Sequence, residues 1–261
     1  MWRSNSLAGK KALVTGASGG IGRAVAIELA KSGVDCLLFA RREAELSETA
    51  RLVRDLGVRR HEFVGDVTDP DDRRAAIEMC KSQMQGLDLL VNNAGVSAHG
   101  RFHESSPDRL RKIMEVNLFA TAEMIRLATP LLSESSGCVA NVGSILGWRG
   151  VPHNAEYCAS KFALRGLSEA IRPELARLGV HVLHASPGTV DTGFFDHLID
   201  KQGDLPWGKR RGVAPEIVAK RIVIGIKSRH KEIAIGWSDW AFVRLARLSL
   251  RLMDRVMSRY G

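Results

Sequence analysis

The sequence of 261 residues predicts an α/β fold in which a doubly wound sheet of seven parallel strands forms a single domain. Short, nearly continuous apolar runs alternate with helix-length segments from residue 11 to about residue 235. Apolar strands of this kind belong to parallel sheets that helices cover on both faces. No repeat, low-complexity tract or linker interrupts the alternation, so we expect one domain.

Seven strands are predicted along the chain. In order, they are Ala12–Val14, Asp35–Ala40, His61–Val64, Leu87–Val91, Cys138–Val142, Val180–Ala185 and Glu232–Ile235. Between them lie segments with apolar residues at helical spacing, such as Ala24–Lys31 and Ala163–Arg177. This order predicts a Rossmann-like catalytic domain over residues 1–236. Pro173 is expected to bend its helix well beyond the helix start, because proline removes one hydrogen bond.

Two segments depart from the alternation. Residues 192–213 follow a predicted strand end and combine glycine, proline, aromatic and charged residues without periodicity, which favours a substrate loop. Residues 237–261 carry arginines three and four residues apart with apolar residues between them, which predicts a basic amphipathic C-terminal helix. We expect this helix either to pack on protein or to contact a membrane peripherally.

The formal net charge of +9 suits an anionic ligand, but the arginines are spread along the chain and no nucleic-acid-binding motif accompanies them. We therefore expect no nucleic-acid partner.

The N-terminus lacks an apolar core and the chain lacks a membrane-length apolar run, which favours a cytoplasmic location, with membrane association through the C-terminal helix as the other option. The four cysteines show no metal-binding spacing, so no metal site is expected.

A glycine-rich turn follows the first predicted strand and opens a helix. Its residues are Gly16, Ser18, Gly19, Gly20, Ile21 and Gly22. Glycines allow backbone N–H groups to approach a pyrophosphate at the positive end of a helix, which predicts a dinucleotide site. The alternative is a tight turn with no ligand, and the strand–turn–helix context argues against it.

The end of the second predicted strand indicates which dinucleotide binds. Arg41 and Arg42 occupy the position where an acidic residue would hold a ribose 2′-OH, and arginine there suits a 2′-phosphate instead. The sequence therefore favours NADP(H), although the arginines could also cap a solvated helix start. Asp66 and Val67 are placed to meet the adenine, and Asn93, Ala94 and Gly95 are placed to pass beneath the cofactor.

Tyr157 and Lys161 are candidates for proton transfer. A tyrosine with an ordinary pKa of about 10 is a poor base at neutral pH. A lysine four residues later lies on the same helix face, and its charge is expected to lower that pKa. Tyr157 would then act as general acid in reduction and as base in oxidation, while Ser144 would donate a hydrogen bond to the carbonyl oxygen. In isolation, such a pair is more often an aromatic contact beside a solvated charge.

These motifs occur together in one order: TGASGGIG at 15–22, DV at 66–67, NNAG at 92–95, Asn117, Ser144, YCASK at 157–161 and PGT at 187–189. In this, the chain resembles the compact short-chain dehydrogenases/reductases over residues 10 to about 192. Gly143 and Ala120 stand where that family often has serine and glycine. The resemblance implies a homodimer or homotetramer, and it implies that Lys161 also holds the nicotinamide ribose and that Asn117 holds a water in a proton relay. It further implies nicotinamide contacts from Pro187, Gly188, Thr189 and Thr192.

The predicted function is NADP(H)-dependent interconversion of a ketone or aldehyde and its alcohol. The expected substrate walls are aromatic or apolar and favour a lipophilic compound: Trp148, Pro152, His153, Phe194, Phe195 and Trp207. The main alternative is a catalytically silent NADP(H)-binding regulator or scaffold. A sugar-nucleotide epimerase would need a larger C-terminal domain. Cys158 is expected to be a packed thiol, and neither His153 nor His184 is expected to act as an acid or base.

Overall fold

The computed structural model of the chain describes residues 6–203, 212–236 and 241. Its seven strands form one parallel sheet in the order β3-β2-β1-β4-β5-β6-β7, which confirms the predicted fold class. The strands are β1 (Lys11–Thr15), β2 (Asp35–Ala40), β3 (Arg60–Val64), β4 (Leu89–Asn92), β5 (Cys138–Val142), β6 (His181–Pro187) and β7 (Glu232–Ile235). The strand order reverses between β1 and β4, and the crevice at such a point is where ligands bind in sheets of this type.

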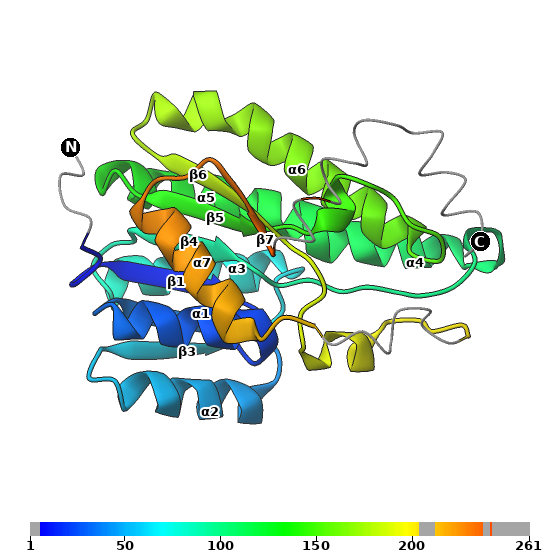
Figure 1. Cartoon of the computed structure of the whole chain (residues 1–261). Coiled ribbons are helices and arrows are strands. Elements are labelled where there is room, and N and C mark those ends of the chain that lie inside the picture. Colours follow the sequence, from blue (N-terminus) through cyan, green and yellow to red (C-terminus); the bar gives the residue numbers. More distant parts are fainter. Residues whose placement is uncertain (1–5, 204–211, 237–240, 242–261) are drawn as a thin grey trace.

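Helices cover both faces of the sheet (Figure 1). The helices are α1 (Gly20–Lys31), α2 (Glu43–Arg54), α3 (Pro70–Ser82), α4 (Pro107–Met114), α5 (Ala120–Glu134), α6 (Ala155–Ala176) and α7 (Pro215–Lys227). One apolar core joins the sheet to α1, α2 and α7, and a second joins it to α3, α5 and α6. Four short segments complete the described chain: η1 (Phe102–Glu104), η2 (Glu115–Phe119), η3 (Ile145–Gly147) and η4 (Gly193–His197).

Local sequence signals explain where several helices begin. Proline is the first residue of α3, α4 and α7, where its missing N–H costs no hydrogen bond. Asp69 and Ser106 cap α3 and α4 by accepting hydrogen bonds from backbone N–H groups two residues later. Pro173 lies near the end of α6, far from Tyr157 in its first turn, so the helix is continuous through Tyr157 and Lys161, the predicted catalytic pair.

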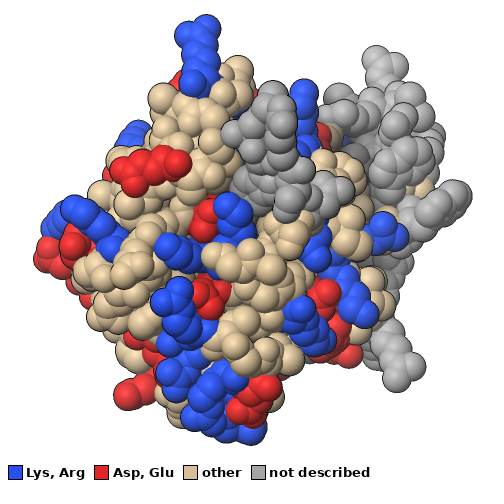
Figure 2. Space-filling view, turned by 90° about the vertical axis from the view of Figure 1, so that its left-hand side faces the viewer, with Lys and Arg blue, Asp and Glu red and all other residues tan. Residues whose placement is uncertain are grey.

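Basic and acidic side chains lie side by side on the face shown in Figure 2. Pairs of this kind occur at the starts of the strands, where Lys10 Nζ lies 2.7 Å from Asp88 Oδ1 and Arg59 Nε lies 2.8 Å from Asp35 Oδ2. Within the described residues, no helix combines the length and apolar character needed to cross a bilayer. The C-terminal helix predicted for 237–261 lies outside the described residues, apart from Ala241.

Candidate active site

A cavity of about 1090 Å³ opens at the carboxyl ends of the strands. It is lined by Ser144 and by nearly all of the predicted cofactor-binding residues. These are Gly16, Ser18, Gly19, Gly20, Ile21, Arg41, Arg42, Asp66, Val67, Asn93, Ala94, Gly95, Tyr157, Lys161, Pro187, Gly188, Thr189 and Thr192. Residues from Gly16 to Thr192 therefore share one cavity. Of the predicted catalytic and cofactor-binding residues, Gly22 and Asn117 do not line it.

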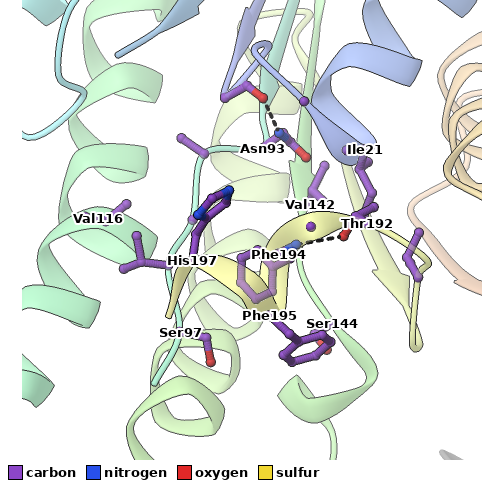
Figure 3. Close-up of a pocket in the computed structure, with 18 of the residues that line it drawn as sticks. Ile21, Asn93, Ser97, Val116, Val142, Ser144, Thr192, Phe194, Phe195 and His197 are labelled. Atoms are coloured by element: carbon purple, nitrogen blue, oxygen red, sulfur yellow. Dashed lines mark hydrogen bonds between the residues drawn. The ribbon is translucent and has the colours of Figure 1, made fainter. Parts of the chain in front are cut away.

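The glycine-rich turn joins β1 to α1 through close backbone contacts. Gly16 has a φ of 65°, in the left-handed region that favours glycine. Asn93 Nδ2 donates to the carbonyl oxygens of Thr15 and Gly16 at 3.1 and 3.2 Å, which fixes the turn against the end of β4 (Figure 3). A Cβ on Gly22 would lie 2.2 Å from the Gly16 carbonyl oxygen. Gly22 thus allows close packing of α1 on the turn and does not itself reach the cavity.

The end of β2 and the segment after β3 form one end of the cavity. Arg41 Nη1 lies 3.3 Å from Asp66 Oδ2, and the Thr68 hydroxyl donates to Asp66 Oδ1 at 2.9 Å. Burial raises the pKa of Asp66, but the hydrogen bonds from Thr68 and the charge of Arg41 outweigh it and hold that pKa below its ordinary value. Asp66 is therefore an ionised acceptor at neutral pH.

Arg42 reaches over the glycine-rich turn from the start of α2. It is the N-cap residue of α2, but its side chain makes no capping hydrogen bond. Instead, its guanidinium donates to Ser18 Oγ at 3.2 Å and lies 3.3 Å from His197 Nε2 and 3.2 Å from Glu45 Oε1. The simple capping alternative therefore does not describe this arginine, which faces the cavity together with polar groups from the glycine-rich turn, α2 and η4.

Tyr157, Ser144 and Lys161 meet at the other end of the cavity. Lys161 Nζ lies 5.6 Å from the centroid of the Tyr157 ring and donates to the Val142 carbonyl oxygen at 3.0 Å. Burial lowers the pKa of Lys161 to about 8. Burial raises the pKa of Tyr157 well above its ordinary value, and a hydrogen bond from Ser144 offsets only part of this. The pKa of Tyr157 is therefore raised and not lowered as the sequence suggested, because desolvation of the buried phenol is the largest effect on it.

Asn117 lies beneath the cavity in η2, a turn of π-helix between α4 and α5. Its side chain is 1% exposed. Its Oδ1 accepts from the Val96 N–H at 2.8 Å, and its Nδ2 donates to the Val96 carbonyl oxygen and to Ser160 Oγ, both at 2.9 Å. The amide thereby joins η2 to the segment after β4 and to α6, one residue before Lys161. π-Helical turns are often found at functional sites.

The substrate walls are only partly those that the sequence predicted. Phe194 and Phe195 come from η4 and line the cavity (Figure 3). The Phe194 ring centroid lies 6.0 Å from that of Tyr157. Trp148 was expected there, but it does not line the cavity: its ring stacks on Arg165 at 3.5 Å and its Nε1 donates to Ser186 Oγ at 3.0 Å. Pro152 and His153 do not line it either, and Trp207 lies outside the described residues.

Several lining residues were not predicted from the sequence. They are Arg23, Ala40, Glu45, Gly65, Val96, Ser97, Val116, Val142, Gly143, Ile145, Leu146, Val151, Asn154, Val190, Gly193 and His197. Most are apolar residues or glycines close to a predicted motif, so their nearness to the motifs was the available signal. Cys158 is buried, as expected, and burial raises its pKa to about 11. His184 is also buried in β6, and burial lowers its pKa to about 3.

A doubly wound sheet with this cavity at its switch point defines a dinucleotide-binding α/β protein. Comparison with known families gives the class: residues 10–203 match the family described as short chain dehydrogenase. The chain belongs to this family, and it is an oxidoreductase that uses NAD(P) to act on CH–OH and C=O groups.

Similar proteins come from all three domains of life. Ketoacyl reductase HetN of Nostoc sp. is 32% identical over 265 residues, covering 98% of this chain and 91% of that protein. Human estradiol 17-beta-dehydrogenase 11 is 32% identical over 250 residues, covering 94% and 81%. The solved structure of an alcohol dehydrogenase from the archaeon Thermococcus sibiricus, complexed with 5-hydroxy-NADP, is 26% identical with a TM-score of 0.77, covering 86% of this chain and 95% of that one.

Proposed function

We propose that this protein is an NADP(H)-dependent oxidoreductase that interconverts a lipophilic ketone or aldehyde and its alcohol, with Tyr157 as the general acid and base. The observation that carries the cofactor assignment is the position of Arg42. Its guanidinium lies beside Ser18 at the glycine-rich turn, where a Cβ on Gly19 would be only 3.1 Å from Nη2. A 2′-phosphate between Arg41, Arg42 and Ser18 would gain charge-assisted hydrogen bonds.

The cavity fits a dinucleotide along its whole length. The glycine-rich turn offers backbone N–H groups at the start of α1, where the helix dipole favours a pyrophosphate. Asp66 would accept from the adenine, and Pro187, Gly188, Thr189 and Thr192 would contact the nicotinamide end. Glu45 pairs with Arg42 and would have to give up part of that contact to a phosphate. The solved neighbour with an NADP derivative supports the same choice.

The proposed chemistry assigns one task to each residue. NADPH supplies the hydride that adds to the carbonyl carbon. Tyr157 donates its phenolic proton to the carbonyl oxygen, so that the product is an alcohol and Tyr157 becomes a tyrosinate. The Ser144 hydroxyl donates a hydrogen bond to the same oxygen as negative charge develops on it, and Lys161 stabilises the tyrosinate and holds the nicotinamide ribose. Asn117 supports the relay that returns a proton to Tyr157.

The walls near Tyr157 favour an apolar substrate. Phe194, Phe195, Leu146, Val151 and Val116 supply aliphatic and aromatic surface there. The human relative is named for estradiol, which is a lipophilic alcohol. Methyl ketones of increasing length, from acetone through 2-hexanone to 2-decanone, test this proposal. We expect kcat/KM to rise along the series, and equal values for acetone and 2-decanone would contradict it.

Fluorescence titration with NADPH and NADH tests the cofactor assignment. We expect wild-type protein to bind NADPH more tightly, and the Arg41→Ala/Arg42→Ala variant to bind both with similar, weak affinity. Arg51→Ala/Arg54→Ala removes the same charge from the solvent-exposed part of α2 and is the matched control. Tighter NADH binding in wild type would overturn the assignment. Cofactor binding with no turnover of any carbonyl would favour the silent regulator or scaffold.

Two partner proposals accompany this function. We infer a homodimer or homotetramer, which sedimentation of the purified protein tests directly. The segment 237–261 is proposed either to pack on protein or to contact a membrane peripherally, and flotation with vesicles of anionic lipid, with and without residues 238–261, distinguishes the two. Equal flotation of the full chain and of the chain without residues 238–261 would show that this segment does not bind the membrane.

A further inference from the structure

A buried ion-pair cluster joins α4, the start of α6 and the substrate loop. Arg109 on α4 is 4% exposed and Glu156 on α6 is 2% exposed. Glu156 Oε1 accepts from Arg109 Nε at 2.9 Å and lies 2.8 Å from Nη2. On the other side of the guanidinium, Nη1 lies 2.9 Å from Asp200 Oδ2. None of these three residues lines the cavity, and the proposed chemistry uses none of them.

The two carboxylates come from different parts of the site. Glu156 precedes Tyr157 directly and lies in the first turn of α6, where a negative charge is favourable. The Ser105 hydroxyl also donates to Glu156 Oε1 at 3.0 Å, so the start of α6 is held from two directions. Asp200 lies in the substrate loop, three residues after the end of η4, which carries Phe194.

Backbone hydrogen bonds extend this connection to the cavity wall. The Ile199 N–H donates to the Ser97 carbonyl oxygen at 3.0 Å, and the His99 N–H donates to the Asp200 carbonyl oxygen at 3.0 Å. The Gln202 N–H donates to the His99 carbonyl oxygen at 2.8 Å, and His99 and Lys201 form a parallel bridge. Ser97 lines the cavity beside η4 (Figure 3). Residues 199–202, in the middle of the substrate loop, are thus paired with the segment that follows β4.

The geometry of the guanidinium explains why this cluster holds a fixed arrangement. A buried cation is stable only when it is paired and hydrogen-bonded. The planar fork of arginine donates in fixed directions, so its two carboxylate partners are held at a fixed separation. Asp200 is the more exposed of the two, with 38% of its side chain exposed against 1% for Glu156. We therefore expect removal of the Asp200 carboxylate to loosen the middle of the substrate loop while the buried Arg109–Glu156 pair persists.

We propose that Arg109 is a positioning residue that sets the distance between the wall formed by Phe194 and Phe195 and the hydroxyl of Tyr157. It acts through Asp200 on the substrate loop and through Glu156 on the start of α6. The Phe194 ring already lies near Tyr157, so a shift of the loop changes how a substrate carbonyl meets that hydroxyl. The expected change in KM for the substrate rests on the proposed role of Tyr157 as the general acid and base.

The kinetic test compares Asp200→Ala with Asp196→Ala. Asp196 lies in the same loop and carries the same charge, but it is exposed and makes no ion pair with Arg109. With 2-decanone and NADPH, we expect Asp200→Ala to raise KM for the ketone about tenfold, because a hydrogen bond to a charged group is lost. The Kd for NADPH stays near the wild-type value, and Asp200→Glu recovers part of the loss. An unchanged KM, or an equal increase in Asp196→Ala, would overturn the proposal.

Hydrogen exchange tests the anchoring without turnover. In Asp200→Ala and in Arg109→Lys, which keeps the charge but loses the fork, we expect faster amide exchange at His99, Ile199 and Gln202. Asp196→Ala is expected to match wild type. Unchanged exchange in Asp200→Ala would overturn the anchoring. A wild-type protein that binds NADPH but reduces no ketone would contradict the proposed function, while exchange would still decide whether Arg109 anchors the loop.

Discussion

Tyr157 and Lys161 are both shifted towards their uncharged forms, and this affects the two directions of the reaction differently. Burial raises the pKa of Tyr157 and lowers that of Lys161 to about 8. Tyr157 therefore keeps its proton at neutral pH, which suits donation to a carbonyl oxygen. Lys161 is charged below pH 8, and its charge stabilises the tyrosinate that donation produces.

These pKa shifts predict opposite pH dependences for the two directions. Below pH 8, Lys161 is protonated and reduction proceeds, whereas above that value the charge is lost and kcat/KM for reduction falls. Oxidation needs Tyr157 as a base, so kcat/KM for the alcohol rises as pH increases through the same range. Initial rates with 2-decanone and 2-decanol from pH 6 to about 10 measure both, with circular dichroism at each pH as the control for unfolding. Two parallel profiles would contradict this assignment.

A steric restriction explains why the residue before Ser144 is glycine. A Cβ on Gly143 would lie 2.4 Å from His184 Nε2, and His184 is fixed in β6 by a contact of 3.2 Å between its Nδ1 and Ser168 Oγ. The histidine thus occupies the space that the usual serine side chain would need. The sequence shows both residues, but only the pairing of β5 with β6 shows that they touch.

Gly143→Ser is therefore expected to lower the free energy of unfolding by about 1–3 kcal/mol, as added volume does in a packed core. Urea unfolding measures this change, and Gly150→Ser, where a Cβ meets nothing within 4 Å, is the control. His184→Ala in the Gly143→Ser background should cost less than the sum of the two single changes, because they share one contact. Strict additivity would show that His184 is not the cause.

At the scale of secondary-structure elements, the sequence predicts the strands more accurately than the turns between them. All seven predicted strands agree with the structure to within about two residues, because buried parallel strands leave continuous apolar runs. The π-helical turn around Asn117 carries no local signal, since it is stabilised by contacts with Val96 and Ser160. Trp148 was misplaced for a similar reason: its aromatic character suits a wall, but Arg165 and Ser186 determine where its ring lies.

Substitution by alanine is expected to have opposite effects on stability at two glycines that lie in helices, because only Gly22 packs against the glycine-rich turn. Gly22→Ala places a Cβ 2.2 Å from the Gly16 carbonyl oxygen, so α1 must move away from the turn. We expect lower stability in urea and weaker NADPH binding, although Gly22 does not line the cavity. Gly166→Ala in α6 meets open space and is expected to stabilise the protein by up to about 1 kcal/mol through helix propensity. Wild-type NADPH affinity in Gly22→Ala would contradict this role of the α1 packing.

For the molecule as a whole, the positive charge is distributed in a way that favours a small anionic ligand. Many arginines pair with neighbouring carboxylates, as Arg59 does with Asp35 and Arg51 with Asp55. Arg41 and Arg42 also have acidic neighbours, but they line the cavity and are 62% and 45% exposed, so both remain accessible. A phosphate bound there would connect β2, α1 and η4, which belong to separate parts of the chain.

Such a ligand should stabilise the whole fold, because it binds the folded chain and not the unfolded one. At a concentration of about 100 times its Kd, NADPH adds about 2.7 kcal/mol to the free energy of unfolding. For a chain of this size, that corresponds to a rise in Tm of roughly 5–10 °C. NADH at the same concentration lacks the 2′-phosphate, so its Kd is larger and its effect on Tm is smaller. Scanning calorimetry of wild type and Arg41→Ala/Arg42→Ala measures the difference, which should disappear in the variant. An equal rise with both cofactors in wild type would mean that the arginines at the end of β2 do not select the phosphate.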